Sequence, residues 1–206
     1  MLPEQIRTIK DFNQFSVKEK GSEFIAIVHP VDNEETAVNH LNEIRKKYFN
    51  ATHHCYAYKI KSGELKYSDD GEPNGTAGIR ILKAIEHFDL SDILLVVVRY
   101  FGGTKLGVGP LGKAYYNASI DVLSKSKIVT QTLFQLVEIK TEFNFISQIH
   151  RTLNNYSAII SDSKFTDKAK FKCLIKPNDL AKINIELTNL TNGKVLIVTR
   201  PDYTYF

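Results

Sequence analysis

Hydrophobic residues in the first 128 positions mostly follow the period of two that is typical of β-strands, and segments with a helical period separate the strands. The expected strands are two within residues 15–31, joined by a turn at Lys20–Ser22, and one each at residues 53–60, 64–68 and 93–99. The last of these, ILLVVVR, is apolar at consecutive positions, as expected for a strand that is covered on both faces.

Helices are expected between these strands, at residues 32–48, 76–87 and 111–124. Asp32 and Glu35 resemble a capping box at the start of the first helix. Thr76 is in position to cap the second helix. Strands and helices thus alternate in this part of the chain.

Beyond Lys127 the pattern changes to strand, helix, two strands, helix and strand. The order βαββαβ is the split βαβ arrangement of ferredoxin-like domains. We therefore expect an α+β protein with two domains, residues 1–128 and residues 129–206, joined by a short linker at residues 125–127.

Composition narrows the function only modestly. A net charge of +4 and a pI of about 8.9 permit an RNA or ribosome partner without requiring one. Cys55 and Cys173 lie far apart and outside CxxC pairs, so neither a disulfide framework nor a cysteine-based zinc site is expected. The sequence shows no signal-peptide pattern and no apolar run of membrane length, so we expect a cytoplasmic protein with no membrane partner.

Two glycine-bearing loops flank the buried strand and hold most of the candidate chemistry. The first, SDDGEPNGTAG at residues 68–78, is typical either of a turn that bonds its own backbone or of a loop that binds Mg²⁺ or supplies a general base. The second, RYFGGTKLGVGPLGK at residues 99–113, is either an anion site made by backbone amides, Arg99 and Lys105, or a tight strand-to-helix crossover. An acidic loop repels nucleic acid, so the first loop is expected either to lie away from any RNA surface or to pair with Arg99.

His53, His54 and Cys55 lie at the start of one expected strand. Adjacent residues on a strand point to opposite faces, so His53 and His54 are not expected to chelate one metal, whereas His53 and Cys55 share a face. Three interpretations stay open: a core histidine that hydrogen-bonds the acidic loop, a metal site completed by Asp69 or Asp70, and covalent chemistry by Cys55. The first is preferred, and no metal or cofactor is expected.

Most of the basic excess lies after residue 128, and part of it gathers on one expected hairpin. Its lysines are Lys164, Lys168, Lys170 and Lys172. Positions 168, 170 and 172 would share one face of a strand. The cluster indicates either an edge strand that lysines keep from pairing with other chains or a stripe that contacts phosphate.

Three motifs in order resemble the YigZ/IMPACT family. They are THHCYAY at residues 52–58, SDDGEPNGTAG at 68–78 and VVVRYFGGTKLGVGPLGKAY at 97–116. The family has a His-His/Cys strand, a DDGEP loop and an RY(F/Y)GG segment in this order. The C-terminal pattern is similar to the second domain of bacterial members, so the resemblance spans most of the chain and is to the two-domain form without an RWD domain.

The resemblance implies the fold of each domain. The N-terminal domain is expected to be an α/β sandwich like domain 2 of the ribosomal-protein-S-five superfamily. The C-terminal domain is expected to be ferredoxin-like, similar to domains III and V of elongation factor G. The resemblance also implies RNA or ribosome binding and a part in the regulation of translation.

The preferred hypothesis is a non-enzymatic protein that binds RNA or the ribosome. The residues expected to contact phosphate or RNA are Arg99, Tyr100, Gly102, Gly103, Lys105, Gly107 and Lys113, with the hairpin lysines as a secondary basic face. Either Tyr100 or Phe101 is a candidate to stack on a base.

An enzyme of nucleotide or phosphate chemistry is the alternative. Its candidate residues are Asp69, Asp70, Glu72 and His54, which would hold Mg²⁺ or act as bases. A protein-interaction module is a third possibility, and the sequence predicts no oligomeric state.

Overall fold

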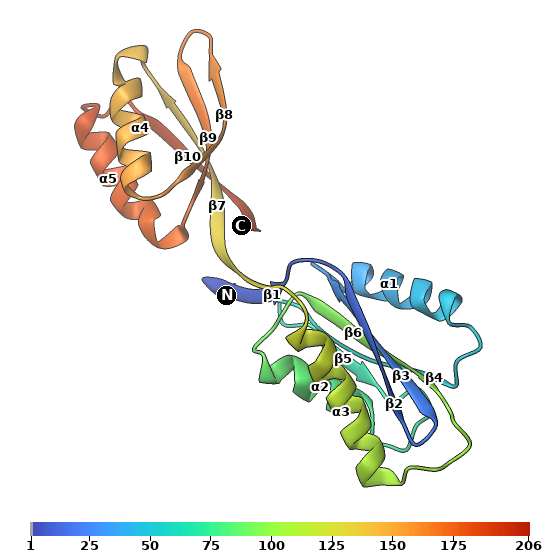
Figure 1. The fold of residues 1–206 in the computed structure, drawn as a ribbon. Coiled ribbons are helices and arrows are strands. Elements are labelled where there is room, and N and C mark those ends of the chain that lie inside the picture. Colours follow the sequence, from blue (N-terminus) through green and yellow to red (C-terminus); the bar gives the residue numbers. More distant parts are fainter. Residues whose placement is uncertain (1) are drawn as a thin grey trace. The chain divides into compact units, whose positions relative to one another are not determined.

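The computed structural model describes residues 2–206, and the chain divides into two compact units with a boundary between Thr130 and Gln131 (Figure 1). Each unit has hydrophobic core clusters of its own. The protein is therefore of mixed α+β class, as expected. Within residues 2–206, no helix is long and apolar enough to cross a membrane.

The N-terminal unit is built on an antiparallel sheet with the strand order β2-β3-β6-β4-β5. Its strands are β2 (Asn13–Glu19), β3 (Ser22–Pro30), β4 (His53–Lys59), β5 (Leu65–Ser68) and β6 (Ile93–Tyr100). β6 is the central strand, and its residues from Ile93 to Val98 are completely buried. The continuous apolar run in the sequence thus corresponds to a strand covered on both faces.

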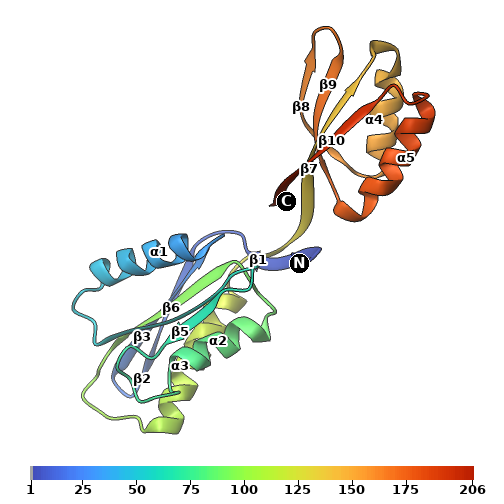
Figure 2. The same cartoon turned by 180° about the vertical axis from the view of Figure 1, so that it is seen from behind.

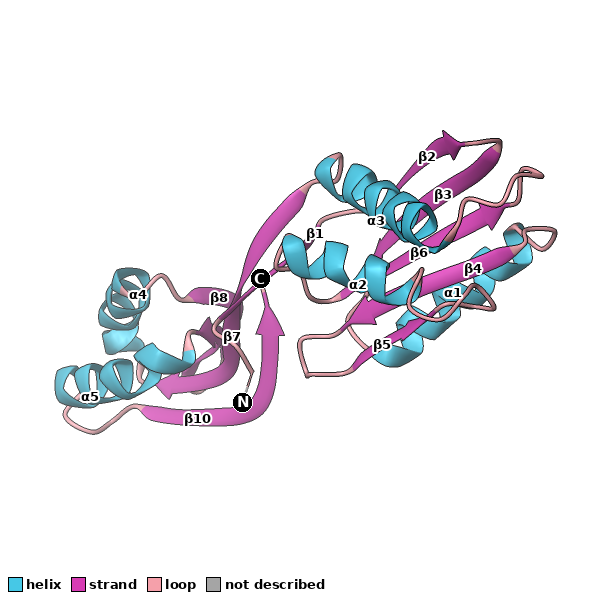
Figure 3. Ribbon diagram, turned by 90° about the horizontal axis from the view of Figure 1, so that it is seen from below, coloured by secondary structure: helices cyan, strands magenta, loops and turns pink. Residues whose placement is uncertain are grey.

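Helices cover both faces of this sheet, as Figure 3 shows. The helices are α1 (Glu34–Lys47), α2 (Gly78–His87) and α3 (Val108–Ser124). α1 packs on the face that includes Leu94 and Val96 of β6, whereas α2 and α3 pack on the face that includes Leu95 and Val97. Alternation along β6 therefore fills two separate cores.

The C-terminal unit has the expected order of elements. They are β7 (Ile128–Thr141), α4 (Ile146–Asn155), β8 (Ile159–Phe165), β9 (Ala169–Ile175), α5 (Leu180–Leu190) and β10 (Leu196–Tyr205), with short 3₁₀ turns at Phe143–Phe145 and Pro177–Asp179. β7 pairs with β10 on one side and with β9 on the other, and β8 completes the order β10-β7-β9-β8. Both helices pack on one face of this sheet (Figure 2). The result is the ferredoxin-like split βαβ arrangement.

The helices and strands differ from the sequence-based expectation in one strand and two helix caps. A short strand, β1 (Gln5–Ile9), pairs with β7 and was not predicted. Asn33, rather than Asp32, caps α1, because its side-chain oxygen accepts the backbone N–H of Thr36 at 2.8 Å. Thr76 does not cap α2, because its hydroxyl donates to the carbonyl oxygen of Pro73 at 2.6 Å.

Candidate functional site

The arginine that ends the buried strand turns inward. Arg99 is only 5% exposed, and its Nη1 lies 2.5 Å from Oε1 of Glu72 in the acidic loop. Its Nη2 donates to the hydroxyl of Ser22 at 3.3 Å, and its guanidinium lies 5.4 Å from the ring centroid of Phe24. A buried ion pair therefore joins the two glycine-bearing loops. Pairing with Arg99 was one of the two arrangements expected for the acidic loop.

Tyr115 of α3 and Cys55 of β4 extend this buried network. The Tyr115 hydroxyl donates to Oε1 of Glu72 at 2.8 Å, and the Cys55 sulfur lies 3.3 Å from the same hydroxyl. Burial raises the pKa of both the Cys55 thiol and the Tyr115 phenol far above their usual ranges. A thiol held protonated in the interior is a poor nucleophile, so this environment does not favour covalent chemistry by Cys55.

Asp69 caps the start of α2, although it lies eight positions before Ala77 in the sequence. One of its carboxylate oxygens accepts the backbone N–H groups of Ala77 and Gly78, each at 2.8 Å, and the other accepts the N–H of Gly75 at 2.9 Å. These amides are donors at the start of the helix that lack intrahelical acceptors. The carboxylate therefore closes the loop on itself.

The two histidines and Asp70 hold the same loop against β4. Nδ1 of His53 lies 2.7 Å from the carbonyl oxygen of Asp70. The Asp70 carboxylate accepts the backbone N–H of His54 at 2.6 Å and lies 3.5 Å from Arg45. Of the three interpretations of this segment, the structure therefore agrees with the one in which a histidine hydrogen-bonds the acidic loop. Within residues 2–206, no cluster of three or more His, Cys, Asp or Glu side chains could hold a metal ion.

The glycine loop at residues 101–107 lies over the β2–β3 turn. A Cβ built on Gly102 would lie 1.9 Å from the carbonyl carbon of Gly21, so these two backbones touch only because both residues lack side chains. Gly103 and Gly107 have positive φ angles of 85° and 83°. Lys105 is exposed on this loop. The geometry therefore requires a tight crossover, and it also presents one lysine to solvent.

The two aromatic residues of this loop have different environments. The Tyr100 hydroxyl donates to the side-chain oxygen of Asn50 at 2.9 Å. The Phe101 ring is 46% exposed, with the Arg99 guanidinium 5.6 Å from its centroid. Phe101 is thus the more accessible ring for stacking.

A basic groove runs between α2 and α3. Its volume is about 560 Å³, and its lining residues are Arg80, Lys83 and His87 of α2 and Gly109, Gly112, Lys113 and Tyr116 of α3. The spacing of the three α2 residues places them on one face of the helix. Among residues 2–206, no Asp or Glu lines the groove. Of the seven residues, only Lys113 was a sequence-based candidate, although the period of the α2 residues is visible in the sequence.

Three of the four hairpin lysines lie on strands. Lys164 lies on β8, and Lys170 and Lys172 lie on β9. Lys168 lies in the bend before β9, so it belongs to neither strand. The expectation of one shared strand face for positions 168, 170 and 172 is therefore corrected at Lys168.

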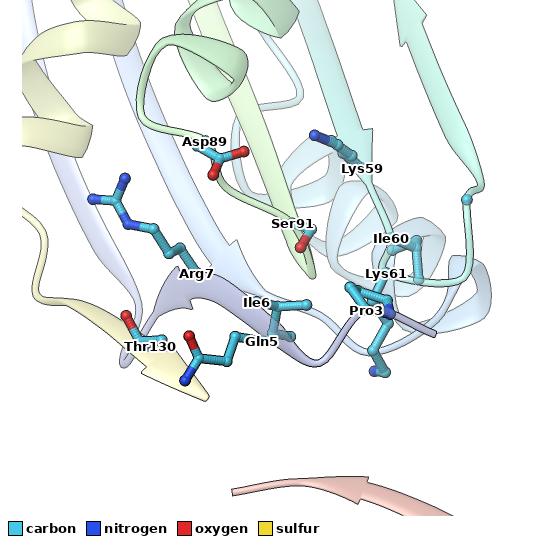
Figure 4. A pocket seen from close by; sticks show the side chains of 11 residues that line it. Pro3, Gln5, Ile6, Arg7, Lys59, Ile60, Lys61, Asp89, Ser91 and Thr130 are labelled. Carbon is cyan, nitrogen blue, oxygen red and sulfur yellow. The ribbon is translucent and has the colours of Figure 1, made fainter. Parts of the chain in front are cut away.

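A second hollow, of about 470 Å³, lies at the β1 side of the N-terminal unit (Figure 4). Arg7, Lys59 and Asp89 are among the charged residues that line it, and Lys61 forms an ion pair with Asp92 at 2.6 Å. Its walls carry both signs of charge. It therefore lacks the single-sign lining of the groove between α2 and α3.

The comparisons with known families match both parts of the chain. Residues 20–123 match the Impact N-terminal domain, and residues 139–194 match a domain of unknown function, DUF1949. A crystal structure of a hypothetical protein superposes with a TM-score of 0.69 at 25% identity, covering 98% of this chain and 100% of its own.

Relatives of similar length carry the family's name. The IMPACT family member YvyE of Bacillus subtilis is 30% identical over 189 residues, which span 91% of this chain and 87% of the relative. The IMPACT family member YigZ of Escherichia coli is 28% identical over 183 residues, which span 87% of this chain and 90% of the relative. The domain match and these full-length similarities agree with the motifs, and the chain belongs to the IMPACT family.

Proposed function

We propose that the groove between α2 and α3 binds the phosphate backbone of RNA. We also propose that this binding serves the regulation of translation on the ribosome. The observation that carries the proposal is the lining of the groove: three cationic side chains and a histidine, with no carboxylate from the part of the chain that the structure describes. Phosphate contacts by Lys and Arg supply most sequence-independent affinity for nucleic acid.

The shape of the groove also supports this proposal. Gly109 has no side chain and is exposed, so a ligand backbone can approach the start of α3 closely. Gly112 is buried, and the side chain of Arg80 packs over it. Arg80, Lys83 and Lys113 are exposed, and within residues 2–206 no ion pair joins them to an acidic residue. Their charges are therefore available to a ligand, in contrast to that of Arg99.

We assign the glycine-loop residues different parts in this function. Lys105 and the exposed Phe101 extend the contact, the lysine to phosphate and the ring to a base. Arg99 is a positioning residue, because its guanidinium is committed to Glu72 and to Ser22. The link to the ribosome rests on the resemblance of the two domains to ribosomal-protein and elongation-factor domains.

The three acidic side chains of the alternative enzyme all accept bonds from protein groups. Asp69 accepts three backbone N–H groups, Asp70 accepts the N–H of His54, and Glu72 accepts from Arg99 and Tyr115. These bonds favour a structural role for the loop. Thermal stabilisation by nucleotide and Mg²⁺ that is lost in Asp70→Asn would instead favour the enzyme.

The test is a triple variant, Arg80→Gln, Lys83→Gln and Lys113→Gln, titrated with a fluorescent single-stranded RNA. We expect affinity to fall about 100-fold at ~50 mM salt, and the slope of log K against log salt to flatten by about 2, because three phosphate contacts of about 0.7 each are lost. Co-sedimentation with ribosomes should fall in parallel.

The matched control is Lys18→Gln, Lys46→Gln and Lys182→Gln, which removes the same charge from exposed lysines outside the groove. It is expected to change affinity only slightly. An equal loss in both variants would mean that net charge alone drives binding, and no loss in the groove variant would refute the site.

A further inference from the structure

The open face of the C-terminal sheet carries three lysines in one row. The strand register places Lys170 of β9 directly between Lys140 of β7 and Lys164 of β8. Phe171, the next residue of β9, is buried in the core beneath α4 and α5. Alternation therefore puts Lys170 and its two neighbours on the face that the helices leave open.

Solubility alone does not account for this row. β8 is an edge strand, so Lys164 can serve to block pairing with other chains. β7 and β9 are interior strands, where that protection is not needed. Like charges directly opposite each other on neighbouring strands destabilise a sheet. Lys140 and Lys170 thus add repulsion to the folded protein without protecting an edge.

The neighbouring row shows a different arrangement. There Lys172 lies between Glu138 and Asp162, so charges of opposite sign alternate across the three strands. Glu138 also accepts from Nη2 of Arg200 at 2.7 Å. The ion pair of Lys170 within residues 2–206 is a 4.0 Å contact to Asp167, whose side chain is 78% exposed, and such a surface pair adds little stability. The excess positive charge is therefore concentrated on the row of three lysines.

A small hollow of about 80 Å³ lies over the two rows. It is lined by the three lysines of the row, by the residues of the neighbouring row (Glu138, Asp162 and Lys172), and by Ile139 and Phe171. The lysine row spans two strand spacings, or about 10 Å. The ammonium groups lie in a line on an open surface. Such an arrangement can contact successive phosphates of a nucleic-acid strand, whereas a single anion would be better held by an enclosed site.

We infer that this face is a second RNA-binding surface, at which Lys140, Lys164 and Lys170 contact the phosphate backbone. The inference rests on the proposed function, since it assigns a second contact to the same ligand. The bound polyanion offsets the repulsion within the row. Two sites on one chain also raise the affinity for an RNA long enough to reach both.

The experiment uses the full chain with Lys140→Gln, Lys164→Gln and Lys170→Gln, titrated with the same labelled single-stranded RNA. We expect at least a tenfold loss of affinity at ~50 mM salt and a salt slope flattened by about 2, because three phosphate contacts are removed. The triple variant at Lys18, Lys46 and Lys182 again controls for net charge. Thermal melts establish that each variant is folded.

The outcomes separate this inference from the proposed function. If the groove variant loses affinity while the row variant binds like the control, the second surface is refuted and the proposed function stands. If the unmodified protein binds no RNA at ~50 mM salt, the proposed function fails and the inference fails with it. A third arm adds inorganic phosphate: if it raises the melting temperature of the parent but not of the row variant, while RNA affinity is equal in both, the row binds free phosphate and the inference is wrong.

Discussion

The Arg99→Ala variant is expected to lose about 3–5 kcal/mol of unfolding free energy, because it leaves the buried Glu72 carboxylate without its guanidinium partner. The substitution also removes the bond from Nη2 of Arg99 to the Ser22 hydroxyl. Since that hydroxyl accepts the backbone N–H of Gly102 at 3.2 Å, the position of the glycine loop is affected as well. Urea denaturation followed by circular dichroism measures the loss.

A double-mutant cycle distinguishes the ion pair from simple packing. The variants are Arg99→Met, Glu72→Gln and the combination of the two. Removing both charges together is expected to cost less than the sum of the single costs, because no unpaired charge remains buried. Lys105→Ala, on the same loop but exposed, should change stability by no more than about 0.5 kcal/mol. Additive single costs would contradict a coupled pair between Arg99 and Glu72.

The inward orientation of Arg99 is a feature that could not be predicted from the sequence. Along β6 the side chains alternate, so Arg99 lies on the same side as Leu95 and Val97 and faces α2 and α3. Because both faces of β6 are buried, its apolar run has no polar positions to reveal this alternation. An arginine at the end of such a run is read as facing solvent, although it lies under the loop that follows.

Local patterns predicted the elements well, and non-local contacts account for what was missed. The C-terminal order βαββαβ followed from hydrophobic period and turn residues alone. β1 was not predicted because its partner, β7, lies more than a hundred positions away. Asp69 was not predicted as the cap of α2 because the path of the loop, rather than its sequence spacing, brings the carboxylate to Ala77 and Gly78.

The same division holds for the basic surfaces. A turn near residue 167 makes the pairing of Lys164 with Lys170 readable from the hairpin, but their alignment with Lys140 depends on the β7–β9 register. In the groove, Arg80, Lys83 and His87 share a helix face by their spacing alone. Their position opposite Lys113 depends on how α2 and α3 pack. For each surface, the sequence therefore predicts the local spacing of the basic residues but not the tertiary contact that brings the remaining lysine to them.

The Gly102→Ala variant is expected to be destabilised by about 3 kcal/mol, at the upper end of the cost of over-packing. The added Cβ would lie 1.9 Å from the carbonyl carbon of Gly21 and 2.3 Å from the backbone nitrogen of Ser22. Both are backbone atoms, so no side-chain rotation relieves the clash, and the β2–β3 turn must move away from the glycine loop. That movement would weaken the bonds that the Ser22 hydroxyl accepts from the backbone N–H of Gly102 and from Nη2 of Arg99. Urea denaturation measures this cost too.

Gly109→Ala is the matched control, because a Cβ at Gly109 would meet no atom within 4 Å outside its chain neighbours and its own helix, and the residue lies in the first turn of α3. An alanine there is expected to change stability by less than about 1 kcal/mol, since it restricts the unfolded chain more than glycine does, whereas Pro110 disfavours a helical backbone at a preceding residue that carries a Cβ. The two substitutions add the same methyl group to nearby glycines in different surroundings. If Gly102→Ala and Gly109→Ala cost the same, the contact between the two loops does not determine the need for glycine at position 102. A loss of about 3 kcal/mol in Gly102→Ala beside a small change in Gly109→Ala would show that Gly102 is required so that the β2–β3 turn can lie against the loop that follows β6.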